Sequence, residues 1–210
     1  MTPVTVDLLR HGDAAGGPRF RGSLDDPLTE TGWAQMRAAV IGRQGWDALV
    51  TSPLLRCADF AAELASELQL PLHHDERLRE IHFGAWEGRT YSELMGLDPL
   101  AVTRFFADPL GHPPPDAEPI EVFLERVVQI LAELGQGLCG QRPLVITHGG
   151  VIRALLCHVR QWPLTRMAEV DVPHASLHRL VFDADEQCWQ LRSWCWVPCR
   201  GPGAAPTSMP

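Results

Sequence analysis

The amino-acid sequence predicts an α/β fold, in which a three-layer α/β/α sandwich surrounds a mainly parallel sheet with an antiparallel edge strand. Short β-branched runs alternate with amphipathic stretches through most of the 210 residues, a pattern typical of strands joined by helical crossovers. Apolar residues make up 45% of the chain and charged residues 21%, enough for one sizeable core. We therefore expect a single domain over 1–200 and, because Gly, Pro, Ala and Ser dominate it, a disordered tail over 201–210.

The expected strands are short and rich in β-branched residues. The run over 4–9 leads into a glycine-containing segment, and 144–147 is the clearest central strand of the chain. The last two runs alternate on either side of a polar turn at 183–187, which predicts the antiparallel edge. The expected strands cover 4–9, 47–51, 71–74, 144–147, 176–183 and 188–196.

Apolar residues recur at helical spacing in the segments between these strands. Thr29 or Thr31 can cap the first helix, and a broad apolar face runs along 121–135. Consecutive prolines at 113–115 interrupt the chain before that helix. We expect 89–120 to form a cap-like insertion over the site. The expected helices cover 29–43, 54–68, 91–97, 100–106, 121–135 and 151–159.

Charge and cysteine usage exclude several classes of protein. The formal net charge of −8 argues against binding to nucleic acid or to an anionic membrane, because both require a spread of basic residues. We expect neither a signal peptide nor a membrane span, and hence a cytoplasmic protein. The six cysteines form no Cys-x-x-Cys pair, which favours buried free thiols. A zinc site at Cys195 and Cys199, with His174 or His178, is the less favoured alternative.

Charged residues follow three of the expected strands. Arg10 and His11 end the first strand, Arg56 comes just after the second, and His148 ends the fourth. Because the carboxyl ends of parallel strands meet in one crevice, we expect these side chains to lie close together. Two guanidinium groups can hold a phosphoryl group bidentately, and the helix that begins after Gly149 adds backbone N–H donors. The sequence therefore predicts a monophosphate site.

Four motifs in a fixed order carry a resemblance to a known family. The motifs are Leu9-Arg10-His11-Gly12, Ser52-Pro53-Leu54-Leu55-Arg56, Leu78-Arg79-Glu80 with Phe83-Gly84-Ala85-Trp86-Glu87-Gly88, and Thr147-His148-Gly149-Gly150. In this order, over roughly residues 6–180, the chain resembles the phosphoglycerate-mutase-like branch of the histidine phosphatase superfamily. Arg21-Gly22-Ser23 followed by Asp26-Pro27-Leu28-Thr29 is similar to the α-ribazole phosphatases of cobalamin assembly.

The resemblance implies a role for each polar residue of these motifs. His11 would be phosphorylated, while Arg10, Arg56 and His148 would hold the phosphoryl group. Glu80 would protonate the leaving oxygen and later deprotonate the attacking water. No metal or other cofactor is expected, because the arginines and histidine supply the electrostatic stabilisation that a divalent cation provides elsewhere.

Further contacts with phosphate or substrate are expected from the Ser23 hydroxyl, the Gly22 backbone and the Gly149 N–H. Many relatives follow Arg-His-Gly with Glu-Thr and a later Asn, where this chain has residues 13–17 of sequence Asp-Ala-Ala-Gly-Gly. Arg21 or Ser23 is the expected substitute for that Asn. Phe60 stands where many relatives have a Thr, and we expect it to affect packing only.

The proton donor and the roles of two aromatic residues each have an alternative interpretation. Glu87 is a rival proton donor to Glu80, although Glu80 is favoured because a donor needs reach as well as a suitable pKa. Phe83 and Trp86 are expected to anchor loops, with stacking on a nucleotide-like substrate as the other interpretation. The remaining histidines without motif partners are expected to be solvated or structural. These are His73, His74, His82 and His112.

The predicted function is hydrolysis of a small phosphate ester through a phosphohistidine, with α-ribazole 5′-phosphate as the best single substrate. A phosphoglycerate mutase is the first alternative, but the chain lacks the longer insertions associated with that branch. A catalytically inactive module that binds a phosphorylated ligand is an alternative from another class. The cap expected over 89–120 argues against a protein substrate. The variable loop 13–27 and this cap decide specificity, and the sequence leaves open both the substrate and a possible homodimer.

Overall fold

A six-stranded sheet forms the centre of the protein in the computed structural model, which describes residues 4–137, 141–183 and 188–196. The strand order is β3-β2-β4-β1-β5-β6. The strands are β1 (Val4–Arg10), β2 (Ala48–Thr51), β3 (Leu72–His74), β4 (Pro143–Thr147), β5 (Leu177–Asp183) and β6 (Cys188–Trp196). Strands β1, β2, β3 and β4 pair with one another in parallel, whereas β5 is antiparallel to β1 and β6 is antiparallel to β5. The predicted mainly parallel sheet is confirmed, and its antiparallel edge consists of two strands.

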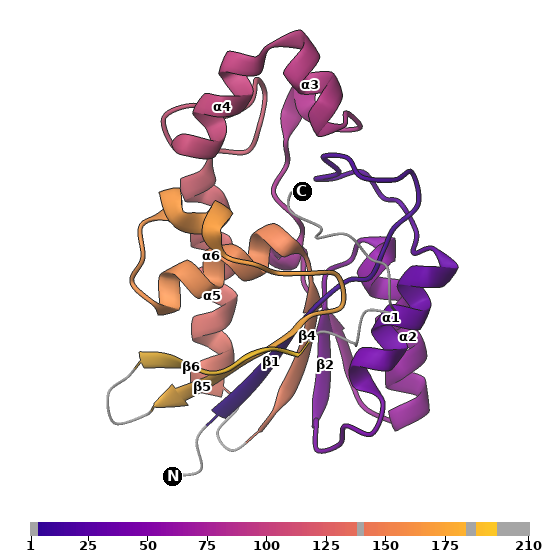
Figure 1. Cartoon of the computed structure of the whole chain (residues 1–210). Helices are drawn as coiled ribbons and strands as arrows, with labels where there is room; N and C mark the ends of the chain where they lie inside the picture. The colour runs from indigo at the N-terminus through magenta and orange to yellow at the C-terminus, as the bar shows by residue number, and fades with distance from the viewer. Residues whose placement is uncertain (1–3, 138–140, 184–187, 197–210) are drawn as a thin grey trace.

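Helices cover both faces of the sheet, which confirms the three-layer sandwich (Figure 1). Helices α1 and α2 lie against one face, and α5 and α6 lie against the other. The helices are α1 (Glu30–Val40), α2 (Leu55–Leu68), α3 (Tyr91–Leu97), α4 (Pro99–Ala107), α5 (Ile120–Gly137) and α6 (Gly149–Val159). Short 3-10 helices cover Glu76–Leu78, Gly84–Trp86 and Leu164–Glu169.

The two central strands explain why both faces must be covered. In β1, Leu8 packs into the core beside α5 and α6, whereas Leu9 packs into the core beside α1 and α2. In β4, Val145 and Ile146 divide in the same way. Successive side chains of a strand point to opposite faces, so a strand with consecutive apolar residues is buried on both sides. This double burial holds the ends of β1 and β4 in fixed positions.

The bounds of the elements differ slightly from those predicted. Helix α1 ends at Val40, because Ile41 has left the helical conformation and Gly42 has a φ of 69°. Helix α6 begins at Gly149, two residues before the predicted start, so that it follows His148 without a linker. The turn at 184–187 and the tail at 201–210 lie outside the described residues, so both predictions remain untested.

Helices α3 and α4 stand above the sheet, beyond the ends of its parallel strands (Figure 1). Aromatic rings connect them to the loop 13–27 through the segment 83–86: the centroid of Phe20 lies 5.1 Å from that of Phe83 and 5.4 Å from that of Trp86. The Trp86 ring in turn lies 5.2 Å from Phe105 of α4. These contacts support the prediction that Phe83 and Trp86 anchor loops. The role of 89–120 as a cap stays a prediction.

No described helix combines the length and hydropathy needed to cross a membrane. Cys57 and Cys157 are buried free thiols, as expected. The side chains of Cys195 and Cys199 lie outside the described part of the protein, and within that part no three His, Cys, Asp or Glu side chains gather as metal ligands would.

Candidate active site

His11 follows the last residue of β1 and is 5% exposed. Its Nδ1 lies 2.7 Å from the Gly12 carbonyl oxygen, which can only accept, so Nδ1 carries the proton and Nε2 keeps a lone pair. Burial, followed by the nearby His148 and Arg10, holds the pKa of His11 well below its usual range. Gly12 is required here because a Cβ would lie 2.3 Å from the Gly32 carbonyl oxygen at the start of α1. His11 is therefore a neutral imidazole with a fixed tautomer.

His148 joins the end of β4 to the start of α6 and is fully buried. Its ring centroid lies 5.2 Å from that of His11, with the two planes at 63°. Arg56 Nε lies 3.2 Å from its Nδ1, and since the guanidinium can only donate, the His148 proton is on Nε2, 2.7 Å from Ser52 Oγ. Burial, then Arg56 and Arg10, lower the pKa of His148 far below its usual range. Both histidines of the site are thus neutral.

Two arginines bring positive charge to the histidines. Arg10 donates from Nη1 to the Val172 carbonyl oxygen at 2.5 Å, but its buried Nε has no hydrogen-bond partner. Burial first, and then repulsion by Arg153, lower the pKa of Arg10 to about 9. Arg56 is 1% exposed and donates to the carbonyl oxygens of Gly22 and Leu24 at 2.9 and 2.6 Å. An unpartnered buried donor on a cation is the feature expected of an anion site.

The Glu80 carboxylate lies at the first turn of α6. It accepts hydrogen bonds from the N–H of Gly150 at 3.0 Å and from its neighbour Ile81 at 3.1 Å. The rival carboxylate, Glu87, accepts three donors instead, the N–H and hydroxyl of Ser23 at 2.8 and 2.7 Å and the N–H of Phe83 at 3.1 Å. Glu87 therefore ties two loops together, whereas Glu80 lies at the helix start that directly follows His148.

Arg126 of α5 holds the segment that carries Glu80. Its Nη1 donates to the carbonyl oxygens of Arg77 and Arg79 at 2.6 and 2.7 Å, and its Nη2 donates to that of Glu80 at 3.2 Å. Nε and Nη2 also bind the Glu118 carboxylate at 2.7 and 2.8 Å. Every guanidinium nitrogen is thus bound, and the backbone on both sides of Glu80 is fixed to α5.

Comparison with known proteins identifies the family. The model of the histidine phosphatase superfamily (branch 1) matches residues 6–197. The chain belongs to this superfamily. Its α/β fold is like that of the phosphoglycerate mutases.

Curated relatives of this superfamily member include mycobacterial proteins. The chain is 36% identical over 160 residues to a bifunctional protein of Mycobacterium tuberculosis, an alignment that covers 74% of this chain and 44% of that relative. The chain thus spans less than half the length of that relative. It is 33% identical over 168 residues to the glucosyl-3-phosphoglycerate phosphatase of M. tuberculosis, covering 75% of each chain.

Solved structures resemble the chain over nearly its whole length. A mycobacterial glucosyl-3-phosphoglycerate phosphatase in complex with inorganic phosphate has a TM-score of 0.79 and 30% identity, covering 92% of this chain and 98% of that one. The α-ribazole phosphatase from Shigella flexneri has a TM-score of 0.78 and 25% identity, with coverages of 96% and 100%. The resemblance therefore extends to phosphatases named for at least two substrates.

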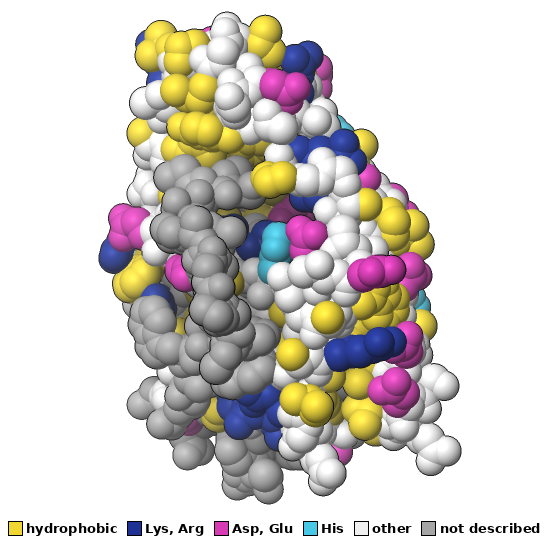
Figure 2. Space-filling model, turned by 45° about the vertical axis from the view of Figure 1, so that its right-hand side comes forward, with side chains coloured by type: hydrophobic (Ala, Val, Ile, Leu, Met, Phe, Trp, Pro, Cys, Tyr) yellow, Lys and Arg dark blue, Asp and Glu magenta, His cyan; other side chains and the backbone are white. Residues whose placement is uncertain are grey.

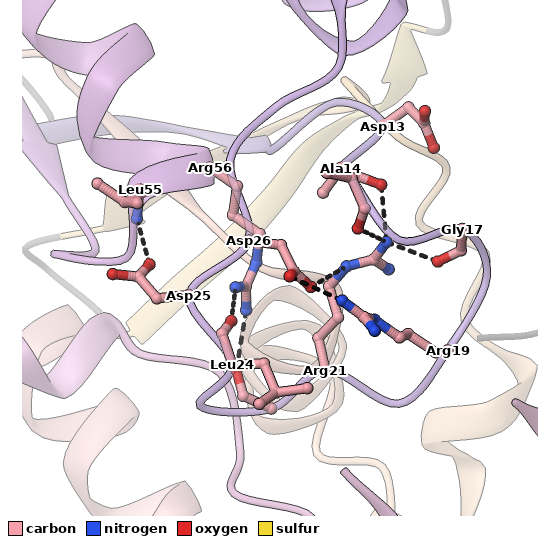
Figure 3. A network of polar contacts seen from close by, with 12 residues as sticks. Asp13, Ala14, Gly17, Arg19, Arg21, Leu24, Asp25, Asp26, Leu55 and Arg56 are labelled. Atoms are coloured by element: carbon pink, nitrogen blue, oxygen red, sulfur yellow. Dashed lines mark hydrogen bonds and ion pairs between the residues drawn. The ribbon is translucent and has the colours of Figure 1, made fainter. Parts of the chain in front are cut away.

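Arg21, a donor that was expected to contact substrate, holds the loop 13–27 together (Figure 3). Arg21 Nη2 donates to the carbonyl oxygens of Ala14, Ala15 and Gly17 at 2.7, 2.9 and 2.6 Å. Its Nε lies 3.2 Å from Asp26. With the Ser23 hydroxyl bound to Glu87, neither polar group points freely away from the loop. Their expected substrate contacts, like that of Gly149 N–H, remain predictions.

The same loop is tied to the first turn of α2, which contains Arg56. Asp25 Oδ1 accepts the N–H of Leu55 at 2.7 Å and so caps α2 from a distant part of the chain. The Leu24 carbonyl oxygen points at Arg56 (Figure 3). The Gly22 carbonyl oxygen also accepts from Arg56, and the expected contact of the Gly22 backbone with substrate remains a prediction.

Two residues of the site were not predicted as catalytic or substrate-binding residues. The ring centroid of His174 lies 5.7 Å from that of His11, and burial, then Arg10, lower the pKa of His174 to about 3. Arg153 lies beside Arg10 and Gly149 in α6. The position of Arg153, four residues after Gly149, places it one turn into the helix and is the signal that could have found it.

Figure 2 shows histidine, basic and acidic side chains gathered around a hollow below α3 and α4.

Proposed function

We propose that the protein hydrolyses small phosphate monoesters through a phosphohistidine on His11. The observation that carries the proposal is the Nε2 lone pair of the neutral His11 in a cluster whose buried Arg10 Nε lacks a partner. A nucleophile beside unpartnered cationic donors suits attack on a phosphorus atom that carries negative oxygens.

In the first proposed step, His11 Nε2 forms a bond to phosphorus and the ester P–O bond breaks. The leaving oxygen takes a proton from Glu80, which must therefore be protonated when substrate binds. Arg10 and Arg56 stabilise the charge on the phosphoryl oxygens, as does His148 when its Nε2–H donates to a phosphoryl oxygen in place of Ser52. In the second step Glu80 accepts a proton from water, the water oxygen bonds to phosphorus, the His11–phosphorus bond breaks and phosphate is released.

Glu80 is the proposed acid because of what surrounds each carboxylate. Glu80 accepts two backbone N–H groups at the start of α6, next to His148. Glu87 accepts three donors that join the loops of Ser23 and Phe83. Glu80 is thus the carboxylate that lies next to the proposed phosphoryl site.

For the substrate we propose α-ribazole 5′-phosphate, on the motif at Arg21-Gly22-Ser23 and the likeness to the Shigella flexneri enzyme. A second candidate is a phosphate ester that carries a carboxylate, as the names of the glucosyl-3-phosphoglycerate phosphatase relatives suggest. A mutase and an inactive phospho-ligand-binding module remain the alternatives that the test must separate. The proposed partner is thus a small-molecule phosphate ester, with no metal or other cofactor.

The test measures phosphate release from a panel containing α-ribazole 5′-phosphate, nucleotides, sugar phosphates and phosphoglycerates. We expect release that survives EDTA, together with rapid ³²P labelling that is lost in His11→Ala and kept in His73→Ala, a substitution in the exposed edge strand β3. Loss of activity on chelation would contradict the metal-free mechanism. Isomerisation of 3-phosphoglycerate without phosphate release would indicate a mutase, and binding without labelling would indicate an inactive module.

A further inference from the structure

Arg153 brings a second guanidinium to Arg10 at the start of α6. Its Nε donates to the Val170 carbonyl oxygen at 3.0 Å, while Arg10 Nη1 donates to that of Val172 at 2.5 Å. Two carbonyl groups of one short segment therefore orient both arginines. Such anchoring removes side-chain freedom before a ligand arrives, as a preorganised site requires.

The two guanidinium groups converge on Gly149. A Cβ at this position would lie 2.9 Å from Arg153 Nη1 and 3.1 Å from Arg10 Nε. Any side chain here would displace one of the two arginines, so glycine is what permits them to flank the helix start. The first N–H groups of α6 and the helix dipole add to the positive potential at the same point.

Neither arginine is neutralised by the described part of the protein. No ion pair with a described carboxylate involves Arg10 or Arg153, and the terminal nitrogens of Arg153 have no hydrogen-bond partner there. The acidic groups that act on both are Glu80, which binds the backbone of α6, and the exposed Asp171. Placing like charges together away from water is unfavourable unless an anion joins them.

A phosphoryl group alone does not account for this much positive charge. A phosphate monoester carries at most two negative charges, and Arg10 with Arg56 already matches them. Glu80 must be protonated to act as the acid, so it offers no charge to Arg153 in the reactive complex. The neighbouring His174 is neutral and does not alter the balance. Arg153 therefore remains as a cation whose terminal donors have no partner among the described residues.

We propose that Arg153 binds a second anionic group of the substrate, a carboxylate carried by the phosphate ester. This inference rests on the proposed hydrolysis through His11, and it favours the second candidate substrate, a phosphate ester that carries a carboxylate, over α-ribazole 5′-phosphate, which has none. The carboxylate accepts hydrogen bonds from Arg153 Nη1 and Nη2, while the phosphoryl group lies between Arg10 and Arg56.

The test compares 3-phosphoglycerate with glycerol 3-phosphate, which has a CH₂OH group where 3-phosphoglycerate has the carboxylate. For the wild-type protein we expect kcat/KM to favour 3-phosphoglycerate. Arg153→Met should lower the ratio of the two kcat/KM values roughly tenfold to a hundredfold, the loss expected for a charge-assisted hydrogen-bonded pair. Arg160→Met, at the other end of α6 where the guanidinium covers the Trp162 ring, is the matched control and should keep the ratio.

An unchanged ratio in Arg153→Met would overturn the proposal, because Arg153 would then hold the phosphoryl group or only the segment at Val170. Arg153→Lys keeps the charge and should lower the ratio less, so it replaces the Met variant if that variant does not fold. Calorimetric Kd values of both ligands for His11→Ala, with and without Arg153→Met, give the same ratio without turnover. A carboxylate preference in binding without any phosphate release by wild type would leave this inference standing and contradict the proposed hydrolysis.

Discussion

Two halves of the site use their polar groups differently. The strand-end half consists of Arg10, His11 and His148 with the start of α6, and it leaves the His11 Nε2 lone pair and the Arg10 Nε donor unused. The loop half consists of residues 13–27 and 78–88, where Arg21 donates to three carbonyl groups of its own loop. The contrast suggests that the strand ends carry the chemistry and that the loops hold it in place.

The largest effect should come from the strand-end half. His148→Ala removes a buried group that lies 5.2 Å from His11, and we expect kcat to fall roughly 10²–10³-fold, as for loss of one transition-state donor. Ser52→Ala removes only the hydroxyl that accepts from His148 Nε2 and should lower kcat by about tenfold. Steady-state kinetics and circular dichroism of both variants check this order. A His148→Ala enzyme that is no slower than Ser52→Ala would break the comparison.

A smaller effect on kcat/KM, which depends on the substrate, is expected when Arg126, the residue that holds part of the loop half, is replaced. Arg126→Met removes the three hydrogen bonds to the backbone around Glu80. Since proton donation matters most for a poor leaving group, kcat/KM should fall on the order of tenfold more for glycerol 3-phosphate than for p-nitrophenyl phosphate. Arg77→Met, whose side chain binds Asp75 and Glu133 of the same region, is the matched control. Equal losses on both substrates would mean that Arg126 affects only folding.

The two halves also differ in what sequence reasoning could predict. Arg10, His11 and His148 lie directly after apolar runs that must be strands, and a parallel sheet brings such ends together, so both their positions and their proximity could be inferred. Arg153 and Arg126 lie within helical patterns. In a sequence, an arginine that faces a site and one that faces water have the same periodicity, and only the packing of α6 and α5 separates them.

The loop residues show a different difficulty. Ser23 and Arg21 have the donors that a substrate needs, but the same donors can satisfy carbonyl and carboxylate groups of the loop, as they do here. Composition does not decide between these uses. The role of Glu87 as a loop anchor could not be inferred either, because its three donors come from two segments that are 60 residues apart in the chain and meet only in the fold.

Acid should destabilise the protein through a buried histidine of the sheet that carries the strand-end half. His178 lies opposite Leu8 in the pairing of β5 with β1, and burial lowers its pKa to about 4 from 6.5. The folded protein therefore binds this proton less readily than the unfolded chain, so stability is lost as the pH falls from 6.5 toward 4. From pH 7 to pH 5 this one group should lower the free energy of unfolding by about 2 kcal/mol.

Urea denaturation at the two pH values checks this change. In His178→Gln the difference between pH 7 and pH 5 should shrink by that amount, while His74→Gln, at an exposed position of β3, should leave the difference as in wild type. An equal pH dependence in His178→Gln and wild type would show that this buried histidine does not contribute to acid sensitivity.

The smallest effect is expected from Ser23→Ala, and it tests the comparison most directly. If the hydroxyl only ties its loop to Glu87, its loss removes one hydrogen bond of 2.7 Å between two protein groups, and kcat/KM should fall less than about tenfold. Glu87→Gln should give a similar fall, because it weakens the same junction. If instead Ser23 leaves Glu87 to bind the phosphoryl group, Ser23→Ala should approach the effect of His148→Ala while Glu87→Gln stays mild. The ratio of these two losses therefore decides whether the loop half holds the site or takes part in it.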